Sequence, residues 1–130
     1  MPEPEDPILV AALIERHDGH VLICRPPDVG ERRRWEFPGG PARPGESPEA
    51  AIRRLTAEQV GLRTEILQGQ PPLRSNREGR EAEYRFFLCG PVTGEARPLE
   101  YAEVRWVARG QLCEYDFDPP TCDVVRWFSE

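Results

Sequence analysis

The sequence contains no lysine, and all 17 of its basic residues are arginines. Schiff-base catalysis and a Walker-type phosphate loop both require a lysine amine, so both are excluded. Serines are few (Ser47, Ser75 and Ser129), and neither histidine has an obvious serine or cysteine partner. A hydrolase that works through a catalytic triad is therefore not expected.

Cysteine pairs with metal-ligand spacing are also missing. The four cysteines are scattered without any Cys-x-x-Cys pair, and the two histidines are His17 and His20. This composition argues against a zinc site. It favours reduced, mostly buried cysteines in a cytoplasmic protein.

Long apolar runs are absent as well. None approaches the roughly 18 residues of a membrane span, so no membrane partner is expected. The net charge of −6 argues against a nucleic-acid partner. Residues 1–6 are acidic and do not resemble a secretory signal, so we expect a disordered leader there and a single domain over residues 7–130. A monomer and a homodimer both remain open.

Several segments have the pattern of β-strands. Apolar residues at 8–15 and 21–24 flank turn residues at 17–20, which predicts a β-hairpin. A further short strand is expected at 35–37, ended by the Pro-Gly-Gly-Pro run at 38–41. Other strands are predicted at 62–67, 83–89 and 103–107, with a polar loop rich in proline, arginine and glycine at 69–80.

Two helices are predicted from their end signals. Ser47 is suited to be an N-cap, Pro48 follows at the first helical position, and Gly61 lies just beyond the expected end. A second, short helix begins at Pro119-Pro120 and places Val124, Val125 and Phe128 on one face. Helices and strands in this order predict an α+β sandwich.

The segment around the first helix has the residue types of a phosphate and metal site. A double glycine permits close approach of a ligand to the backbone, and positions 55, 58 and 59 share one face of the helix. Glu58 offers a carboxylate and Gln59 an amide oxygen, which suits Mg²⁺ held partly by substrate phosphates. Arg54 is within reach of Glu46, a pair that would hold the loop on the helix. An ordinary amphipathic helix after a Pro/Gly loop is the alternative.

Residues 35–62, WEFPGGPARPGESPEAAIRRLTAEQVGL, resemble the Nudix box, G-x5-E-x7-R-E-U-x-E-E-x-G-U, in which U is a bulky aliphatic residue. The lead-in at 35–39 resembles the MutT-like branch, whose members hydrolyse nucleoside triphosphates. Segments 22–25, 100–107 and 117–120 are similar to later parts of that branch. The box positions that match are Gly40, Glu46, Arg54, Glu58, Gly61 and Leu62.

The resemblance implies the Nudix fold, an α/β/α sandwich with a mixed central sheet. It implies Mg²⁺- or Mn²⁺-dependent cleavage of a diphosphate linkage in a nucleoside polyphosphate. Glu58, Glu100, the Gly40 carbonyl and Gln59 are the expected metal ligands, with Glu103 as the alternative to Glu100. Glu58, Glu100 and Glu103 are the catalytic candidates, while Gly40, Glu46, Arg54 and Gly61 are assigned to structure.

The box departs from the family pattern where the chemistry is expected. Glutamates are replaced by Leu55 and Gln59, a bulky aliphatic residue by Thr56, and the lysine after the double glycine by Pro41. Leucine removes a ligand, and glutamine is unable to take a proton from water. Two readings follow: a weakened hydrolase, or a catalytically inactive module that binds a nucleotide or a protein partner. Another phosphorylated substrate is a further alternative.

Candidates for substrate binding are also implied by the resemblance. Arg25 is a candidate for contacts with phosphate or a base and Arg34 for contacts with phosphate, although a solvated surface charge is the favoured interpretation of each. Cys122, with Asp123 beside it, stands where branch members read the base edge, and a thiol gives little support to a preference for oxidised guanine. Phe87 is a candidate for stacking on the base, with core packing as its alternative.

Overall fold

The computed structural model describes residues 7–27, 34–77 and 79–129, and its central layer is a five-stranded sheet. The order is β3-β1-β6-β4, with β5 paired to β6. Strands β1 and β6 are parallel and the other pairs are antiparallel, so the sheet is mixed, as predicted. Its strands are β1 (Ile8–Ile14), β3 (Gly39–Pro41), β4 (Arg63–Gly69), β5 (Leu73–Arg77) and β6 (Arg80–Thr93).

The predicted hairpin between the first two strands is wrong. Strand β2 (His20–Arg25) pairs with β7 (Glu103–Ala108) in a separate two-stranded sheet, and a single bridge from Glu15 to Val21 links it to the end of β1. The turn itself forms, with Gly19 at φ +81°. Strand β1 is buried along most of its length and has a strand on each side, so no place is left for β2.

Two further strand predictions need correction. The expected strand at 35–37 is reduced to a bridge between Cys24 and Glu36, and the strand lies instead at Gly39–Pro41, where a break was expected. Proline is tolerated there because β3 is at the edge of the sheet. The loop expected at 69–80 contains strand β5. Its sequence is polar and shows no strand pattern, and the strand forms by pairing with β6 in a hairpin.

Both predicted helices are present with their caps. Helix α1 (Pro48–Val60) begins after Ser47, whose hydroxyl accepts from Ala50 N at 3.1 Å, and ends at Gly61 with φ +70°. Helix α2 (Pro119–Phe128) is capped by Asp118. An unpredicted 3₁₀ helix, η1 (Arg109–Glu114), precedes α2.

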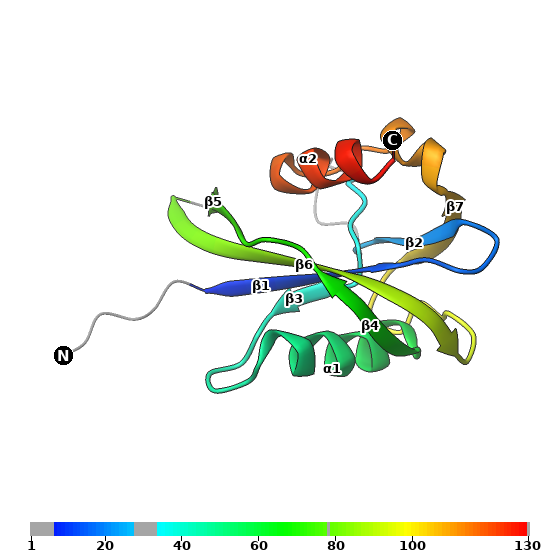
Figure 1. The fold of residues 1–130 in the computed structure, drawn as a ribbon, viewed down its shortest axis with the longest axis horizontal. Helices are drawn as coiled ribbons and strands as arrows, with labels where there is room; N and C mark the ends of the chain where they lie inside the picture. Colours follow the sequence, from blue (N-terminus) through cyan, green and yellow to red (C-terminus); the bar gives the residue numbers. More distant parts are fainter. Residues whose placement is uncertain (1–6, 28–33, 78, 130) are drawn as a thin grey trace.

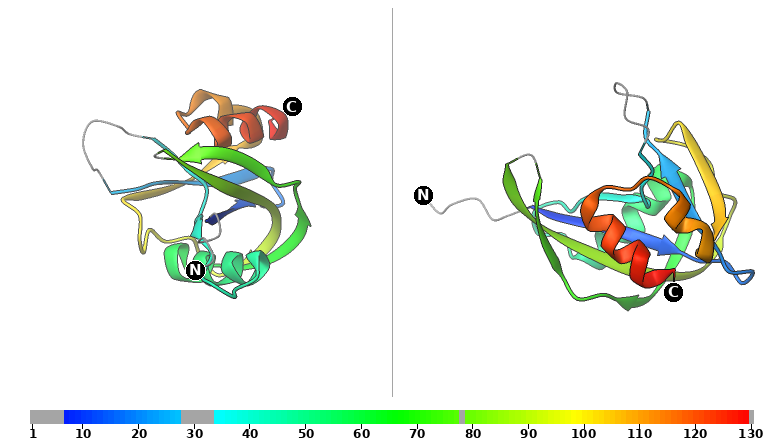
Figure 2. Two further views of the ribbon diagram at one scale, coloured as in Figure 1. Left: turned by 90° about the vertical axis from the view of Figure 1, so that its left-hand side faces the viewer. Right: turned by 90° about the horizontal axis from the view of Figure 1, so that it is seen from above.

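The helices cover opposite faces of the large sheet, α1 on one and α2 on the other (Figures 1 and 2). Each face has its own apolar cluster: Ile52 and Leu55 pack on the α1 side, and Val125 and Phe128 pack on the α2 side. The predicted sandwich is therefore confirmed. None of the described helices has the length and apolar character to cross a membrane. The expected leader at residues 1–6 lies outside the described part of the chain.

Candidate functional site

A cavity of about 130 Å³ lies between the large sheet and the beginning of α2. Gly39 and Gly40 of β3 form one end, and Asp118 and Thr121 lie near the start of α2. Aromatic side chains form much of the wall: Phe37, Tyr84 and Phe86. The lining combines these rings with the two glycines and the acidic residues Glu36 and Asp118, which suits a flat ligand that also carries polar groups.

The walls are held by ring contacts. Phe37 stacks on Phe117 with centroids 5.4 Å apart, and Tyr84 lies 6.4 Å from Phe86. Phe37, Phe86 and Phe117 are all buried, so their positions are fixed by the core rather than by a ligand. A ring that enters the cavity therefore meets preformed apolar surfaces.

The predicted contact between Arg54 and Glu46 is present in bidentate form. Nε and Nη2 of Arg54 donate to the two carboxylate oxygens at 2.9 Å each, and Glu46 also accepts from Arg43 N at 3.0 Å. The hydrogen bonds from Arg54, followed by that from Arg43, lower the pKa of Glu46 to about 2. Arg54 further donates to the Pro41 carbonyl at 3.5 Å. This arrangement fixes the loop between β3 and α1.

The catalytic candidates differ in their surroundings. Glu58 is 48% exposed and lies 3.4 Å from Arg54 Nη1. Glu100 is exposed, and its backbone N–H donates to the carbonyl of Gln59 at 3.2 Å, which places it beside the last turn of α1. Glu58 and Glu100 therefore flank the same helix end.

Glu103 lies in a different setting. It accepts from Arg105 at 2.7 Å and from Arg25 at 3.5 Å. The hydrogen bond from Arg105, followed by the contact with Arg25, lowers the pKa of Glu103 below its usual value. A carboxylate held in its charged form in this way is a weak proton acceptor, so Glu100 is the better candidate for a base.

Leu55 and Gln59 both face the glycine strand. Leu55 is 6% exposed and belongs to the apolar cluster on the α1 side. The Gln59 side chain bonds to both backbone groups of Gly39, at 2.9 and 2.8 Å, and its Oε1 also accepts from Tyr101 at 3.2 Å. The oxygen predicted to bind metal is therefore engaged within the protein.

The predicted substrate-binding residues are dispersed. Arg25 contacts Glu103, and Arg34 lies 3.9 Å from Asp116. Phe87 is 2% exposed in the cluster on the α1 side, which favours its core alternative. Phe86 and Tyr84 of the same strand line the cavity instead. Strand alternation separates 84 and 86 from 87, but does not indicate which face carries the cavity.

Near α2 the residues that line the cavity are not the predicted ones, Cys122 and Asp123, but their neighbours in the sequence. The Cys122 thiol donates to the carbonyl of Phe117, just before its own helix, at 3.1 Å. Asp123 lines a different hollow of about 290 Å³, beside Trp127. Asp118 and Thr121 line the cavity, and neither was predicted. The N-cap position of Asp118 before Pro-Pro was the signal that could have identified it.

The donor set allows a test of whether a metal fits. Within the described residues no group of three or more His, Cys, Asp or Glu side chains is arranged to hold a metal ion. Glu58 in the last turn of α1 and Glu100, whose backbone contacts that turn, supply two carboxylates, so a single Mg²⁺ or Mn²⁺ held there would take its remaining ligands from substrate phosphates and water, which is the usual way Mg²⁺ binds. They do not fit a cage built by the protein alone.

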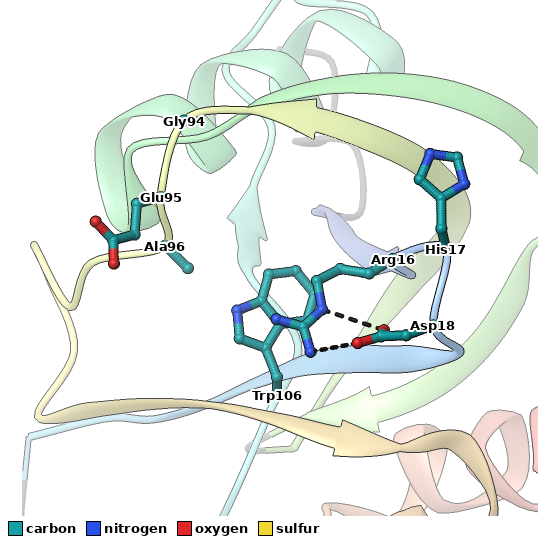
Figure 3. A pocket seen from close by; sticks show the side chains of 7 residues that line it. All are labelled: Arg16, His17, Asp18, Gly94, Glu95, Ala96 and Trp106. Atoms are coloured by element: carbon teal, nitrogen blue, oxygen red, sulfur yellow. Dashed lines mark hydrogen bonds and ion pairs between the residues drawn. The ribbon is translucent and has the colours of Figure 1, made fainter.

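A larger hollow of about 510 Å³ lies elsewhere, between the β1–β2 turn and the segment around Glu95 (Figure 3). The Arg16 guanidinium lies 4.5 Å from the centre of the Trp106 ring and is bound by Asp18 at 2.8 and 3.2 Å. This hollow shares no lining residue with the glycine-ended cavity. The Trp106 face is already covered by Arg16, so we assign no ligand to it.

Comparisons with known proteins agree with this geometry. A family model described as the NUDIX domain matches residues 6–128. A MutT-like protein of Streptomyces ambofaciens is 30% identical over 85% of this chain and 70% of its own length. CTP pyrophosphohydrolase of Escherichia coli is 26% identical over 92% of this chain and 89% of its own. The solution structure of the E. coli ORF135 protein superposes with a TM-score of 0.83, at 23% identity, over 94% of this chain and 87% of that one.

Proposed function

The chain belongs to the Nudix family, and on that premise we propose that it cleaves a diphosphate linkage in a nucleoside polyphosphate, at a reduced rate. The observation that carries the proposal is the aromatic-walled cavity that ends at the glycines preceding the box helix. We expect a base to lie against these rings, with its phosphates towards Gly40. By analogy with the MutT-like branch, the products are a nucleoside monophosphate and pyrophosphate.

We assign the residues of the site to metal binding, proton transfer and support of the loop before α1. Glu58 and Glu100 would hold a divalent ion, Mg²⁺ or Mn²⁺, together with the phosphates, and the Gly40 carbonyl is a further candidate. Such an ion neutralises phosphate charge and acidifies bound water. Glu100 is the candidate that accepts the proton of the attacking water, because no arginine holds its carboxylate in the described contacts, unlike Glu103. The Arg54–Glu46 pair keeps the loop before α1 in place.

The second candidate is a catalytically inactive module that binds a nucleotide or a protein partner. Leu55 and Gln59 favour it, because the first is packed in the core and the second is bonded to Gly39. Neither supplies the negative charge that the family places on this helix face. A cytoplasmic location belongs to both candidates and is supported by four free cysteines.

A release assay distinguishes the two. Purified protein is incubated with a panel of nucleoside di- and triphosphates, including CTP and dGTP, in Mg²⁺, Mn²⁺ or EDTA, and pyrophosphate and phosphate are measured. The proposal expects slow release of pyrophosphate from at least one nucleotide, abolished by EDTA. Binding of a nucleotide with no release in either metal would favour the inactive module.

A further inference from the structure

Gln59 makes a contact that a carboxylate at the same position is unable to make. Its Nε2 donates to the Gly39 carbonyl at 2.8 Å, and its Oε1 accepts from the Gly39 N–H at 2.9 Å. The side-chain amide pairs with Gly39 as a peptide unit of a neighbouring strand would. The contact therefore needs a donor and an acceptor on the same side chain.

The partner of this amide is the outer side of an edge strand. Pro38 O accepts from Ala12 N at 2.8 Å, and bonding alternates along an antiparallel pair, so the N–H and C=O of Gly39 point away from β1. A Cβ on Gly39 would clash with the Val10 carbonyl oxygen, which shows how closely the strand approaches β1. Gln59 closes the side of β3 that the sheet leaves open.

Tyr101 fixes the orientation of the amide. Its hydroxyl donates to Gln59 Oε1 at 3.2 Å. With two donors on Oε1, a flipped amide would set N–H against N–H. The Gln59 backbone carbonyl also accepts from Leu99 and Glu100. One residue thus joins α1, β3 and the segment before β7.

A glutamate at position 59, as in the family box, would accept the same two hydrogen bonds. Its other carboxylate oxygen would then face the Gly39 carbonyl oxygen, at the place where Nε2 now lies 2.8 Å away. Two oxygens at such a separation repel unless a proton or a cation lies between them. The N–H of Gln59 supplies that hydrogen. Leu55 adds no charge nearby, and a Cβ on Gly40 would lie 3.9 Å from its Cδ atoms.

We propose that Gln59 is a positioning residue that takes the place of a cation at this end of the cavity. It holds β3 on α1, so the site is assembled and takes up nucleotide phosphates in the absence of a divalent metal. The nature of the ligand rests on the proposed function, whereas the structural role of Gln59 does not. Metal-independent binding is compatible with hydrolysis that still requires metal.

The structural half is tested by thermal melts without nucleotide, in Mg²⁺ and in EDTA. Gln59→Glu is compared with Gln111→Glu, the same chemical change at an exposed position of η1. Gln59→Glu is expected to melt on the order of 5 °C lower in EDTA and to recover in Mg²⁺. Wild type and Gln111→Glu should melt alike in both. A Gln59→Glu variant as stable as wild type in EDTA, or one that Mg²⁺ does not rescue, overturns the role.

The binding half is tested by titrating CTP and dGTP into each protein. Wild type should still bind in EDTA, and the affinity lost on going from Mg²⁺ to EDTA should be about tenfold larger for Gln59→Glu than for wild type. Wild-type binding that disappears in EDTA overturns the proposal. If neither nucleotide binds in Mg²⁺, the proposed function fails for these substrates, and the melts still decide whether Gln59 replaces a cation.

Discussion

Replacing Leu55 with glutamate restores the family residue and tests whether the helix face still has room for it. Leu55 is 6% exposed and packs in the cluster that joins α1 to β1 and β6. Removing a buried leucine side chain costs about 2–5 kcal/mol, because contacts are lost and a cavity remains. A carboxylate in the same apolar setting adds a desolvation cost. We therefore expect the free energy of unfolding to fall by about 3 kcal/mol or more.

Denaturant unfolding in EDTA and in Mg²⁺ measures this loss for Leu55→Glu. Leu55→Met is the matched control, because it conserves volume and should cost less than about 1.5 kcal/mol. Leu55→Glu should be destabilised in both solutions. The reasoning is refuted if Mg²⁺ restores wild-type stability. The double change Leu55→Glu with Gln59→Glu sharpens the test, since tighter metal binding with faster pyrophosphate release would show a weakened enzyme whose metal geometry is intact.

Three further predictions concern the retained box residues. Glu58→Gln should lower any pyrophosphate release about a hundredfold, because it removes a ligand from a depleted site, and unchanged turnover with EDTA controls would place the chemistry elsewhere. Arg54→Ala should lower the melting temperature with and without metal, whereas a fall in metal affinity alone would contradict its structural role. The pKa of Glu46 falls from 4.5 to about 2 on folding, so its stabilisation is complete above pH 4.5 and is lost as the pH falls towards 2. Melts from pH 7 to pH 2 should therefore decline less steeply for Glu46→Gln, and parallel curves would contradict this assignment.

Local signals predicted the parts of the fold that depend on neighbouring residues. Ser47 and Gly61 mark the two ends of α1, and both caps form as expected. Pairing between distant strands was not readable in the same way. The turn before His20 is present, yet β1 pairs with β6 in parallel and β2 with β7. The apolar pattern of β1 describes its burial and does not specify its partners.

In the site, too, local contacts were predictable from the sequence, and contacts that depend on tertiary packing were not. The Arg54–Glu46 contact follows from the spacing of a loop and the helix that succeeds it, and it is present. Adjacent phenylalanines point to opposite faces of β6, so Phe86 lies in the cluster on the α2 side and lines the cavity, while Phe87 lies in the cluster on the α1 side. Choosing between them requires knowing which helix covers which face. That information lies in the tertiary packing of α2.

The acidic box residues that this chain retains have a counter-charge within the protein, and the positions that depart from the box are uncharged. Carboxylates gathered at one helix end repel one another until a cation binds, so part of the stability of such a site comes from the ion. Here Glu46 and Glu58 both have Arg54 as a counter-charge within the protein. The positions nearest the glycine strand hold uncharged residues, Leu55 and Gln59, that are satisfied by packing and by Gly39. The shape of the cavity thus depends on protein contacts alone, so the proposed uptake of a nucleotide needs no charge at positions 55 and 59.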